Sequence, residues 1–299
     1  MMDIRHLWSV NGLFYSIDEK AVPAGIRARI TVSSHRTSWE TAAMVEMAGR
    51  IGLYLAELPL PIFDHLFIVN QLDPSPAGGK PNLHVVIGHD SGFLAQVLGK
   101  RSESLLSVRN EHLEDSGILY VSHNEDETLL VITGTTPEMT LHAARSLVTD
   151  HFVDAYKEGD PFLFISKETN VLPHAFSQES EKPLESYSLH TLFTTEGLYQ
   201  QKEGEILPTL DVSLKIRNSH LDLTIANVEL AARLALSAGY VCFPLTTCMD
   251  EEKGQRFLIS CETTDAASNQ SKWELNALEG TPALRISAPP TKSLQQFGN

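Results

Sequence analysis

The chain has 299 residues, a formal net charge of −15 at pH 7, and an ordinary globular balance of 42% hydrophobic and 20% charged residues. This length suits about two domains with buried cores, and the composition excludes extended disorder. Because an acidic surface repels phosphate backbones and anionic lipid headgroups, we expect no nucleic-acid partner and no binding to a membrane surface.

The odd number of cysteines, Cys242, Cys248 and Cys261, predicts no disulfide framework. Cys242 and Cys261 lie in strand-like apolar runs, which predict buried structural thiols at these two positions. No two of the three cysteines form a Cys-x-x-Cys pair, and none has a histidine at the spacing of a zinc site. No apolar run approaches the roughly 20 residues that cross a bilayer, so we expect no membrane insertion. The first residues lack the apolar core of a signal peptide. The protein is then cytoplasmic, or extracytoplasmic if a leader has been removed.

An internal repeat is the strongest feature of the sequence. The matched segments follow one order along the chain, at an offset of 185 residues in every match except the fourth, where it is 183. They are Leu7–Phe14 with Leu192–Tyr199, Pro23 with Pro208, His35 with His220, Glu46–Leu53 with Glu229–Leu236, and Pro59-Leu60 with Pro244-Leu245. The sequence therefore predicts two copies of one structural unit.

In the first copy the pattern predicts a strand, a helix, a strand, a hairpin and a closing helix. Residues 26–32 alternate apolar and polar side chains, which is typical of a half-buried strand. Thr37-Ser-Trp-Glu40 is a capping box at the start of a helix. Leu83–Ile87 is a compact apolar strand, and two further strands flank the acidic turn Asn124–Glu127. Gly134-Thr-Thr-Pro-Glu138 then begins the closing helix.

The second copy repeats this plan as far as its hairpin, whose turn is Glu279-Gly280. A closing helix would begin after Ile286, close to the end of the chain. We therefore expect an incomplete second copy, so that the chain is a piece of a longer protein or another element or subunit covers one face of the sheet. The predicted fold class is α/β. Its parts are a first unit at residues 5–165, a polar linker at 166–188 and a truncated second unit at 189–299.

The best candidate site is the run Gly88-His-Asp-Ser-Gly92, just past the predicted strand that ends at Ile87. Open α/β sheets bind ligands beyond the carboxyl ends of their strands, so His89, Asp90 and Ser91 are candidate ligand-binding residues. The alternative is a turn in which the glycines give backbone freedom and Asp90 caps the next helix. Ser91 lies one place too late for a nucleophile elbow, so we expect no hydrolase chemistry from this loop.

His35 and His220 are further candidate ligand-binding residues, because they match between the copies and each follows a first strand. Each either binds a ligand or hydrogen-bonds a loop backbone. Trp8 and Phe193 either pack the start of each copy onto its sheet or, if exposed, stack on sugar rings.

We expect no metal and no cofactor. The twelve histidines include no His-Glu-x-x-His motif and no pair four residues apart on a helical face. Gly78-Gly-Lys-Pro81 lacks the spacing of a phosphate-binding loop, and no Gly-x-Gly-x-x-Gly follows either first strand, so a dinucleotide site is unsupported.

Four segments together form a further pattern: Asn82–Gly88, Gly117–Val121, Leu129–Gly134 and Thr140–Leu147. This pattern resembles the flavodoxin-like α/β domain of the periplasmic regulatory subunit of bacterial cellulose synthase. Ancillary α/β domains ahead of some secreted glycosidases and zinc carboxypeptidases look similar. The resemblance spans residues 26–150 and implies two flavodoxin-like units that form a non-catalytic module of an envelope or secreted protein.

These observations favour a non-catalytic accessory or recognition module, linked through the resemblance to polysaccharide-related proteins. Its partner is then another protein or another domain of the same polypeptide, with carbohydrate as a further candidate. One alternative is an ancillary part of a hydrolase, or an enzyme with its site near Gly88–Gly92. A third is a structural subunit that a partner completes.

Overall fold

The computed structural model describes most of the chain. The described residues are 4–10, 12–16, 23, 25–55, 62, 67–69, 83–111, 115–124, 127–153, 156–157, 159–167, 183–201, 204, 206–217, 220–248, 257–263, 271–278 and 280–288. The glycine-rich loop at 78–81, most of the predicted linker, and residues 289–297, where a closing helix was expected to begin, lie outside them.

The chain divides into two compact units. The first comprises Met1–Met44 and Tyr54–Val171, and the second comprises Val45–Leu53 and Leu172–Asn299. The boundary after Val171 falls within the linker predicted at 166–188. The assignment of Val45–Leu53 to the second unit was not foreseen, because this segment is the middle of a helix that the repeat pattern placed wholly in the first copy.

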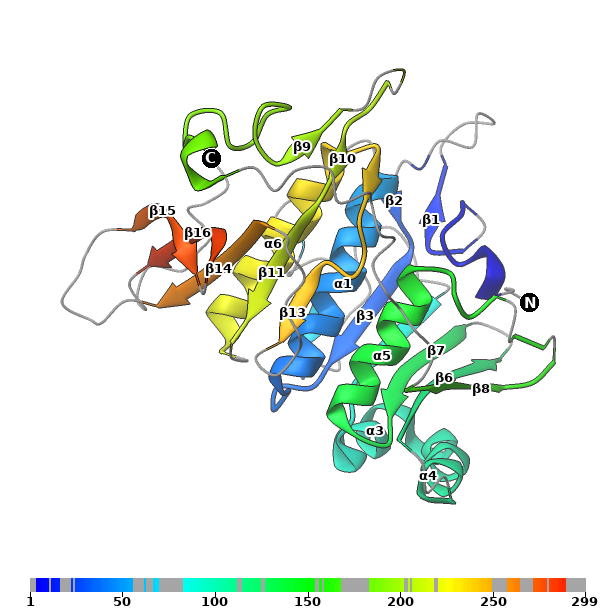
Figure 1. The fold of residues 1–299 in the computed structure, drawn as a ribbon. Coiled ribbons are helices and arrows are strands. Elements are labelled where there is room, and N and C mark those ends of the chain that lie inside the picture. The colour runs from blue at the N-terminus through cyan, green and yellow to red at the C-terminus, as the bar shows by residue number, and fades with distance from the viewer. Residues whose placement is uncertain are drawn as a thin grey trace. The chain divides into compact units, whose positions relative to one another are not determined.

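The first unit is built on a six-stranded mixed sheet in the order β4-β3-β5-β7-β6-β8 (Figure 1). Strands β4, β3, β5 and β7 are parallel to one another, and β6 runs antiparallel to both β7 and β8. A short antiparallel pair, β1 with β2, precedes the sheet. The strands are β1 (Phe14–Tyr15), β2 (Gly25–Ile26), β3 (Ala28–Val32), β4 (Phe67–Val69), β5 (Leu83–Ile87), β6 (Ser116–His123), β7 (Thr128–Gly134) and β8 (Phe162–Ser166).

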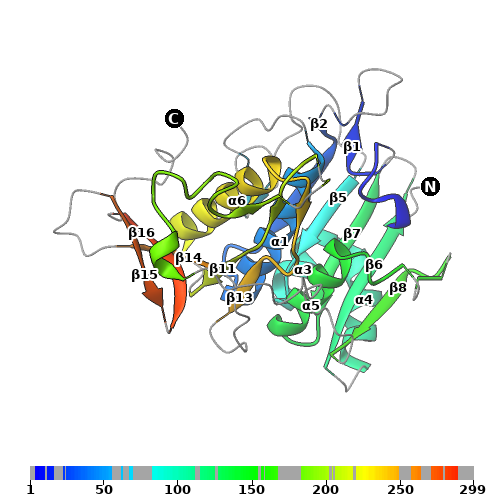
Figure 2. The same ribbon diagram turned by 45° about the horizontal axis from the view of Figure 1, so that its top comes forward.

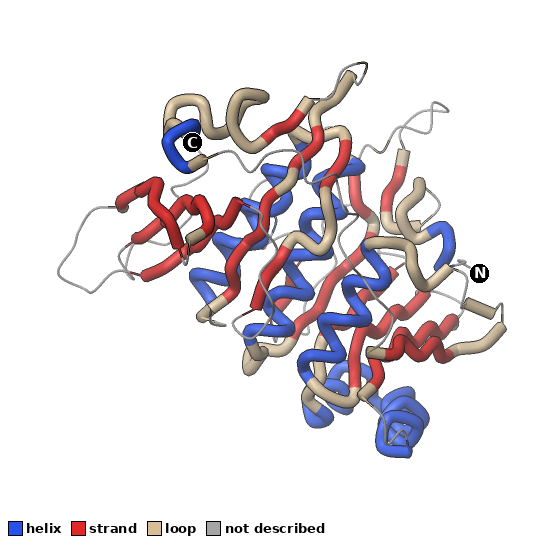
Figure 3. Tube along the Cα trace, in the orientation of Figure 1, coloured by secondary structure: helices blue, strands red, loops and turns tan. Residues whose placement is uncertain are grey.

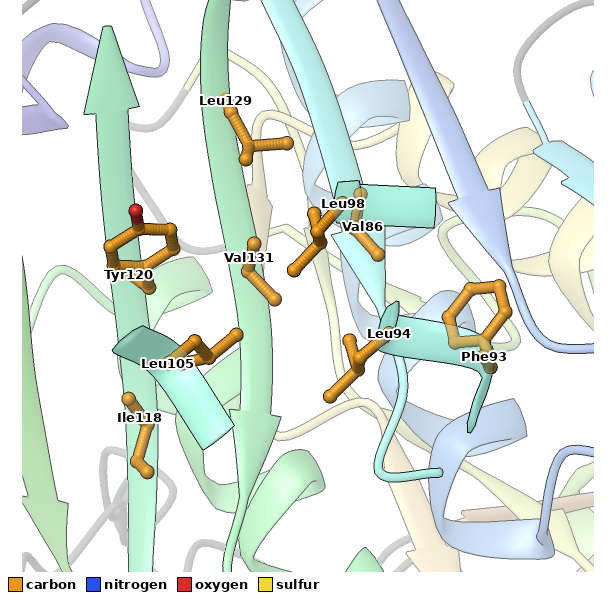
Figure 4. Packing of buried hydrophobic residues seen from close by; sticks show 9 residues of the cluster. All are labelled: Val86, Phe93, Leu94, Leu98, Leu105, Ile118, Tyr120, Leu129 and Val131. Carbon is orange, nitrogen blue, oxygen red and sulfur yellow. The ribbon is translucent and has the colours of Figure 1, made fainter. Parts of the chain in front are cut away.

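Helices cover both faces of this sheet (Figures 1 and 4). Helices α3 and α4 lie on one face, over an apolar cluster that side chains of β5, β6 and β7 complete. Helix α5 covers the other face, so closely that a Cβ on Gly117 would lie 2.8 Å from the carbonyl oxygen of Met139. The cluster consists of Val86, Phe93, Leu94, Leu98, Leu105, Ile118, Tyr120, Leu129 and Val131. The helical elements are η1 (Ile4–His6), the ends of α1 (Ser38–Tyr54), whose middle belongs to the second unit, α3 (Ser91–Leu98), η2 (Gly99–Arg101), α4 (Ser102–Glu111) and α5 (Pro137–Val148).

The second unit has a five-stranded mixed sheet in the order β13-β11-β14-β16-β15 (Figure 2). Its first four strands are parallel, and β15 runs antiparallel to β16. In chain position and strand direction this order repeats that of β4-β3-β5-β7-β6. A small sheet, β12-β10-β9, accompanies it. The elements are η3 (Leu184–Ser186), β9 (Tyr199–Gln200), β10 (Thr209–Leu210), β11 (Val212–Ile216), α6 (Leu221–Leu236), β12 (Tyr240–Val241), β13 (Thr246–Cys248), β14 (Phe257–Thr263), β15 (Lys272–Leu278) and β16 (Thr281–Ala288).

Part of the predicted linker packs on the second sheet. Element η3 contacts β15 and β16. The ring of Tyr187 lies 4.7 Å from that of Phe257, and Phe193 meets Trp273 edge-on at 6.0 Å. Tyr187 of the predicted linker and Phe193 therefore pack against aromatic side chains of β14 and β15.

Both units begin with loops that share one pattern of hydrogen bonds. In the first, the amide of Leu13 donates to the carbonyl of Leu7 at 2.7 Å, and in the second the amide of Leu198 donates to that of Leu192 at 2.8 Å. The other bonds of the first loop, from Gly12 N and Phe14 N to Ser9 O, are likewise repeated from Gly197 N and Tyr199 N to Thr194 O. Each bond recurs at an offset of 185 residues.

Local predictions of helix starts and hairpins are confirmed. Thr37 and Glu40 form both hydrogen bonds of a capping box, and Thr136 caps α5 with Pro137 in its first turn. The predicted hairpins are β6–β7 and β15–β16 (Figure 3). Strands β3 and β11 differ from the half-buried strands expected, because both lie inside their sheets and even polar Thr31 is buried.

Candidate functional site

The candidate loop lies at the carboxyl end of β5, as predicted. From β3 the chain passes through α1 to β4 on one side of β3, whereas β5 lies on the other side and leads towards β6 and β7. The connections that leave β3 and β5 therefore diverge at this edge of the sheet. This is the topological switch point, where open α/β sheets bind ligands.

His89 is half-buried and is held from two sides. Its backbone amide donates to Oε1 of Glu40 at 2.8 Å, and its ring Nδ1 lies 3.1 Å from the carbonyl oxygen of Gly134, at the end of β7. A carbonyl only accepts, so the neutral ring carries its proton on Nδ1. Nε2 then carries a lone pair, so it can accept a hydrogen bond, act as a base or contribute one bond to a ligand.

Asp90 and Ser91 serve the structure of the loop. Asp90 is the N-cap of α3, where its Oδ1 accepts from the amide of Phe93 at 2.6 Å, which confirms the capping alternative. Ser91 Oγ accepts from Arg109 Nη2, and Arg109 Nη1 donates to the carbonyl of His89 at 2.5 Å. A guanidinium cannot act as a base, so this arrangement does not activate the serine.

Glu40 and Arg109 are the residues that position the loop, and the site prediction did not include them. Glu40 is 3% exposed and also accepts from the amide of Thr37 at 2.6 Å. Burial lowers the pKa of Arg109, while the Asp90 carboxylate opposes that shift. Burial likewise lowers the pKa of Arg36, against the opposing influence of Glu40. The capping box indicated one role of Glu40, but nothing local to Arg109 indicated its contact with the loop.

The two matched histidines, His35 and His220, lie in different units. His35 is exposed in the loop after β3, and its amide donates to Ser33 Oγ at 3.1 Å. His220 is exposed at the N-cap of α6, and its carbonyl accepts from the amide of Thr224 at 2.9 Å. His220 is the N-cap of α6, whereas His35 lies two residues before Thr37, the N-cap of α1. Relative to the two helices, the counterpart of His220 is therefore Thr37.

A second polar cluster lies within the first sheet, under η2. His84 of β5 bonds through Nε2 to Thr31 Oγ1 at 2.8 Å and through Nδ1 to Arg29 at 3.1 Å. Burial, with Arg29 and Arg101, lowers the pKa of His84 to about 3, so the ring is neutral at pH 7. Glu127 lies 3.7 Å from Arg29 and 3.8 Å from Arg101. Among the described residues, Nε of Arg29 and Nη1 of Arg101 are buried without a hydrogen-bond partner, so the cluster satisfies its polar groups only in part.

All three cysteines are buried, as predicted for Cys242 and Cys261. Burial raises the pKa of Cys261 to about 12, which suppresses its reactivity. Within the described part of the chain, no three His, Cys, Asp or Glu side chains are placed to hold a metal ion.

The fold and this loop together define a mixed α/β protein with a single half-buried histidine at the switch point of its first sheet. No model of a known protein family matches the sequence, and no curated protein matches it significantly. None of the described helices is long and apolar enough to cross a membrane.

Proposed function

We propose that this protein is a non-catalytic recognition module made of two duplicated, flavodoxin-like α/β units. The observation that carries the proposal is that the polar groups of the candidate loop are hydrogen-bonded within the unit. Asp90 caps a helix, Ser91 is bonded to a guanidinium, and the amide and Nδ1 of His89 are committed to Glu40 and to Gly134. These bonds fix the loop and leave no nucleophile beside a base.

Two observations support the duplication. Five strands of each sheet follow the same order and directions, and the loops that begin the units share their hydrogen bonds at an offset of 185 residues. Strand order alone recurs among unrelated α/β proteins, but backbone hydrogen bonds that recur at the offset of the sequence repeat are independent support for a duplication. We therefore regard the second unit as a copy of the first, whose described residues end at Ala288 of β16, the strand that corresponds to β7.

Carbohydrate is the ligand class that we assign to the module, within an envelope or secreted protein. The resemblance of residues 26–150 to the regulatory subunit of cellulose synthase supports this assignment. So does the exposure of Phe193, 39% exposed, whereas its counterpart Trp8 is buried and donates from Nε1 to the carbonyl of Leu147. An exposed aromatic face can stack on a sugar ring.

The test combines binding and activity. The purified chain should be depleted from solution by an insoluble polysaccharide such as cellulose, and Phe193→Ala should weaken that depletion. Tyr15→Ala is the matched control, because Tyr15 is an aromatic residue of the first unit that is 41% exposed. If no polysaccharide depletes the wild-type chain, the carbohydrate assignment is wrong.

A second candidate function is an enzyme that uses His89 as its base, which the available Nε2 at the switch point favours. Hydrolysis of a glycoside or peptide by the purified chain, lost in His89→Ala and retained in His35→Ala, would establish it and overturn the non-catalytic proposal.

A further inference from the structure

The outer edge of the second sheet differs from that of the first. In the first sheet β6 is covered on its outer edge by β8, which pairs with it antiparallel over Ser116–Tyr120. In the second sheet β15 holds the position of β6, and no described strand pairs with its outer edge (Figure 2). Every residue of β15 is at least partly exposed, whereas six of the eight residues of β6 are buried. An open strand edge is a template for pairing with another strand.

Apolar side chains are exposed beside this edge. Trp273 of β15 is 37% exposed, and its ring partner Phe193 is 39% exposed. Trp273 and Phe193 are set at 81° to each other, so they do not form one flat platform. A strand added along β15 would cover Trp273, which is the kind of central aromatic side chain on which interfaces depend.

Charges alternate across the opposite, polar face of the same sheet. Arg217, just after β11, pairs with Glu262 of β14 at 2.9 Å, and Glu262 pairs with Arg285 of β16 at 2.5 Å. Arg285 is the register partner of Glu274 on β15. The row therefore runs positive, negative, positive, negative, and it ends on Glu274 at the edge of β15, where Nζ of Lys272 of the same strand lies 2.5 Å from the Glu274 carboxylate.

We infer that the edge of β15 pairs with the same strand of a second copy of this chain. In an antiparallel pairing with Trp273 on the two-fold axis, Lys272 of each copy lies opposite Glu274 of the other. Each row of alternating charges then continues into the partner sheet, and the two tryptophans meet at the centre. Opposite charges and aromatic pairs stabilise directly opposed positions of antiparallel strands. Shifting each strand by one residue would set Glu274 against Glu274, and that repulsion selects the register.

The length of the pairing is consistent with this fold. Residues Ser271–Leu275 of one copy would pair with the same residues of the second copy. This overlap of five residues equals the overlap of β8 with β6. The inference does not depend on the proposed ligand, because it uses the edge of β15 and not a sugar contact.

The test is sedimentation equilibrium of the full chain over a range of concentrations. The wild-type chain should form dimers. Glu274→Lys should weaken dimerisation about tenfold or more, because two attractive pairs become repulsive. Lys272→Glu combined with Glu274→Lys should restore it, and Glu103→Lys, an exposed reversal on α4, should leave it unchanged. Hydrogen exchange at residues 272–275 should slow as the wild-type protein dimerises.

A wild-type chain that stays monomeric at all concentrations would overturn the inference. So would a dimer that Glu274→Lys does not weaken, or one that the double reversal fails to restore while circular dichroism shows a folded protein. Pairing of β15 with a strand of another protein only would also overturn it. If the wild-type chain dimerises but no polysaccharide depletes it from solution, the proposed ligand is wrong and this inference stands.

Discussion

Replacing Glu40 with alanine tests whether this residue holds the candidate loop. Its carboxylate accepts from Thr37 N at 2.6 Å, from Thr37 Oγ1 at 3.0 Å and from His89 N at 2.8 Å. A buried donor left without an acceptor costs about 1–3 kcal/mol. Thr37 and His89 are half-buried, so water replaces part of the loss. We expect the free energy of unfolding of the first unit to fall by about 3 kcal/mol.

Urea unfolding, combined with hydrogen exchange of peptides from residues 83–111, measures this loss in the first unit. Exchange at Gly88–Ser91 should accelerate in Glu40→Ala before global unfolding. The matched control is Glu138→Ala in the first turn of α5, where the Lys167 partner is itself exposed, and a loss within about 0.5 kcal/mol is expected. If both substitutions change stability equally, or loop exchange does not change, Glu40 does not position the loop.

Three further predictions follow from buried or crowded positions. Glu46 is fully buried and accepts from Leu245 N at 2.7 Å, Thr246 N at 2.9 Å and Thr246 Oγ1 at 2.5 Å, so Glu46→Ala should destabilise the second unit by about 3–5 kcal/mol. A loss below about 1 kcal/mol in urea unfolding would contradict this. His84 has a folded-state pKa of about 3, below its ordinary 6.5, so between those values the unfolded chain takes up a proton that the folded chain does not. As the pH is lowered from 6.5 towards 3, the free energy of unfolding should therefore decrease, by at most about 1.4 kcal/mol per pH unit. The stability advantage of wild type over His84→Gln should shrink from pH 7 to pH 4.5, and an advantage that stays constant would refute the shift. A Cβ on Gly12 would lie 2.2 Å from the carbonyl oxygen of His6, and one on Gly197 would lie 2.0 Å from that of Leu192. Gly12→Ala and Gly197→Ala should each lower the melting temperature, by an amount that corresponds to about 1–3 kcal/mol, and a neutral effect at either position would argue that the two loops are not equivalent.

The local parts of the fold could be predicted from the sequence because their physics acts over a few residues. A capping box needs Thr37 and Glu40 three residues apart, and Pro137 fits a first helical turn wherever the helix packs. The two hairpins follow from alternating strands around short polar turns. The position of the His89 loop also followed, since strand ends and their connections are encoded in sequence.

The tertiary structure decided what these residues contact. The amide of His89 meets a carboxylate 49 positions away, and Arg109 reaches the same loop only because α3 and α4 fold back along the sheet. The open edge of β15 depends on strand order, which no short pattern contains. Contacts between distant positions are set by how whole elements pack, whereas caps and turns are set by neighbours in the chain. The sequence by itself therefore determined the helix caps, the two hairpins and the position of the candidate loop. Packing determined which side chains hold the loop and which sheet edge no described strand covers.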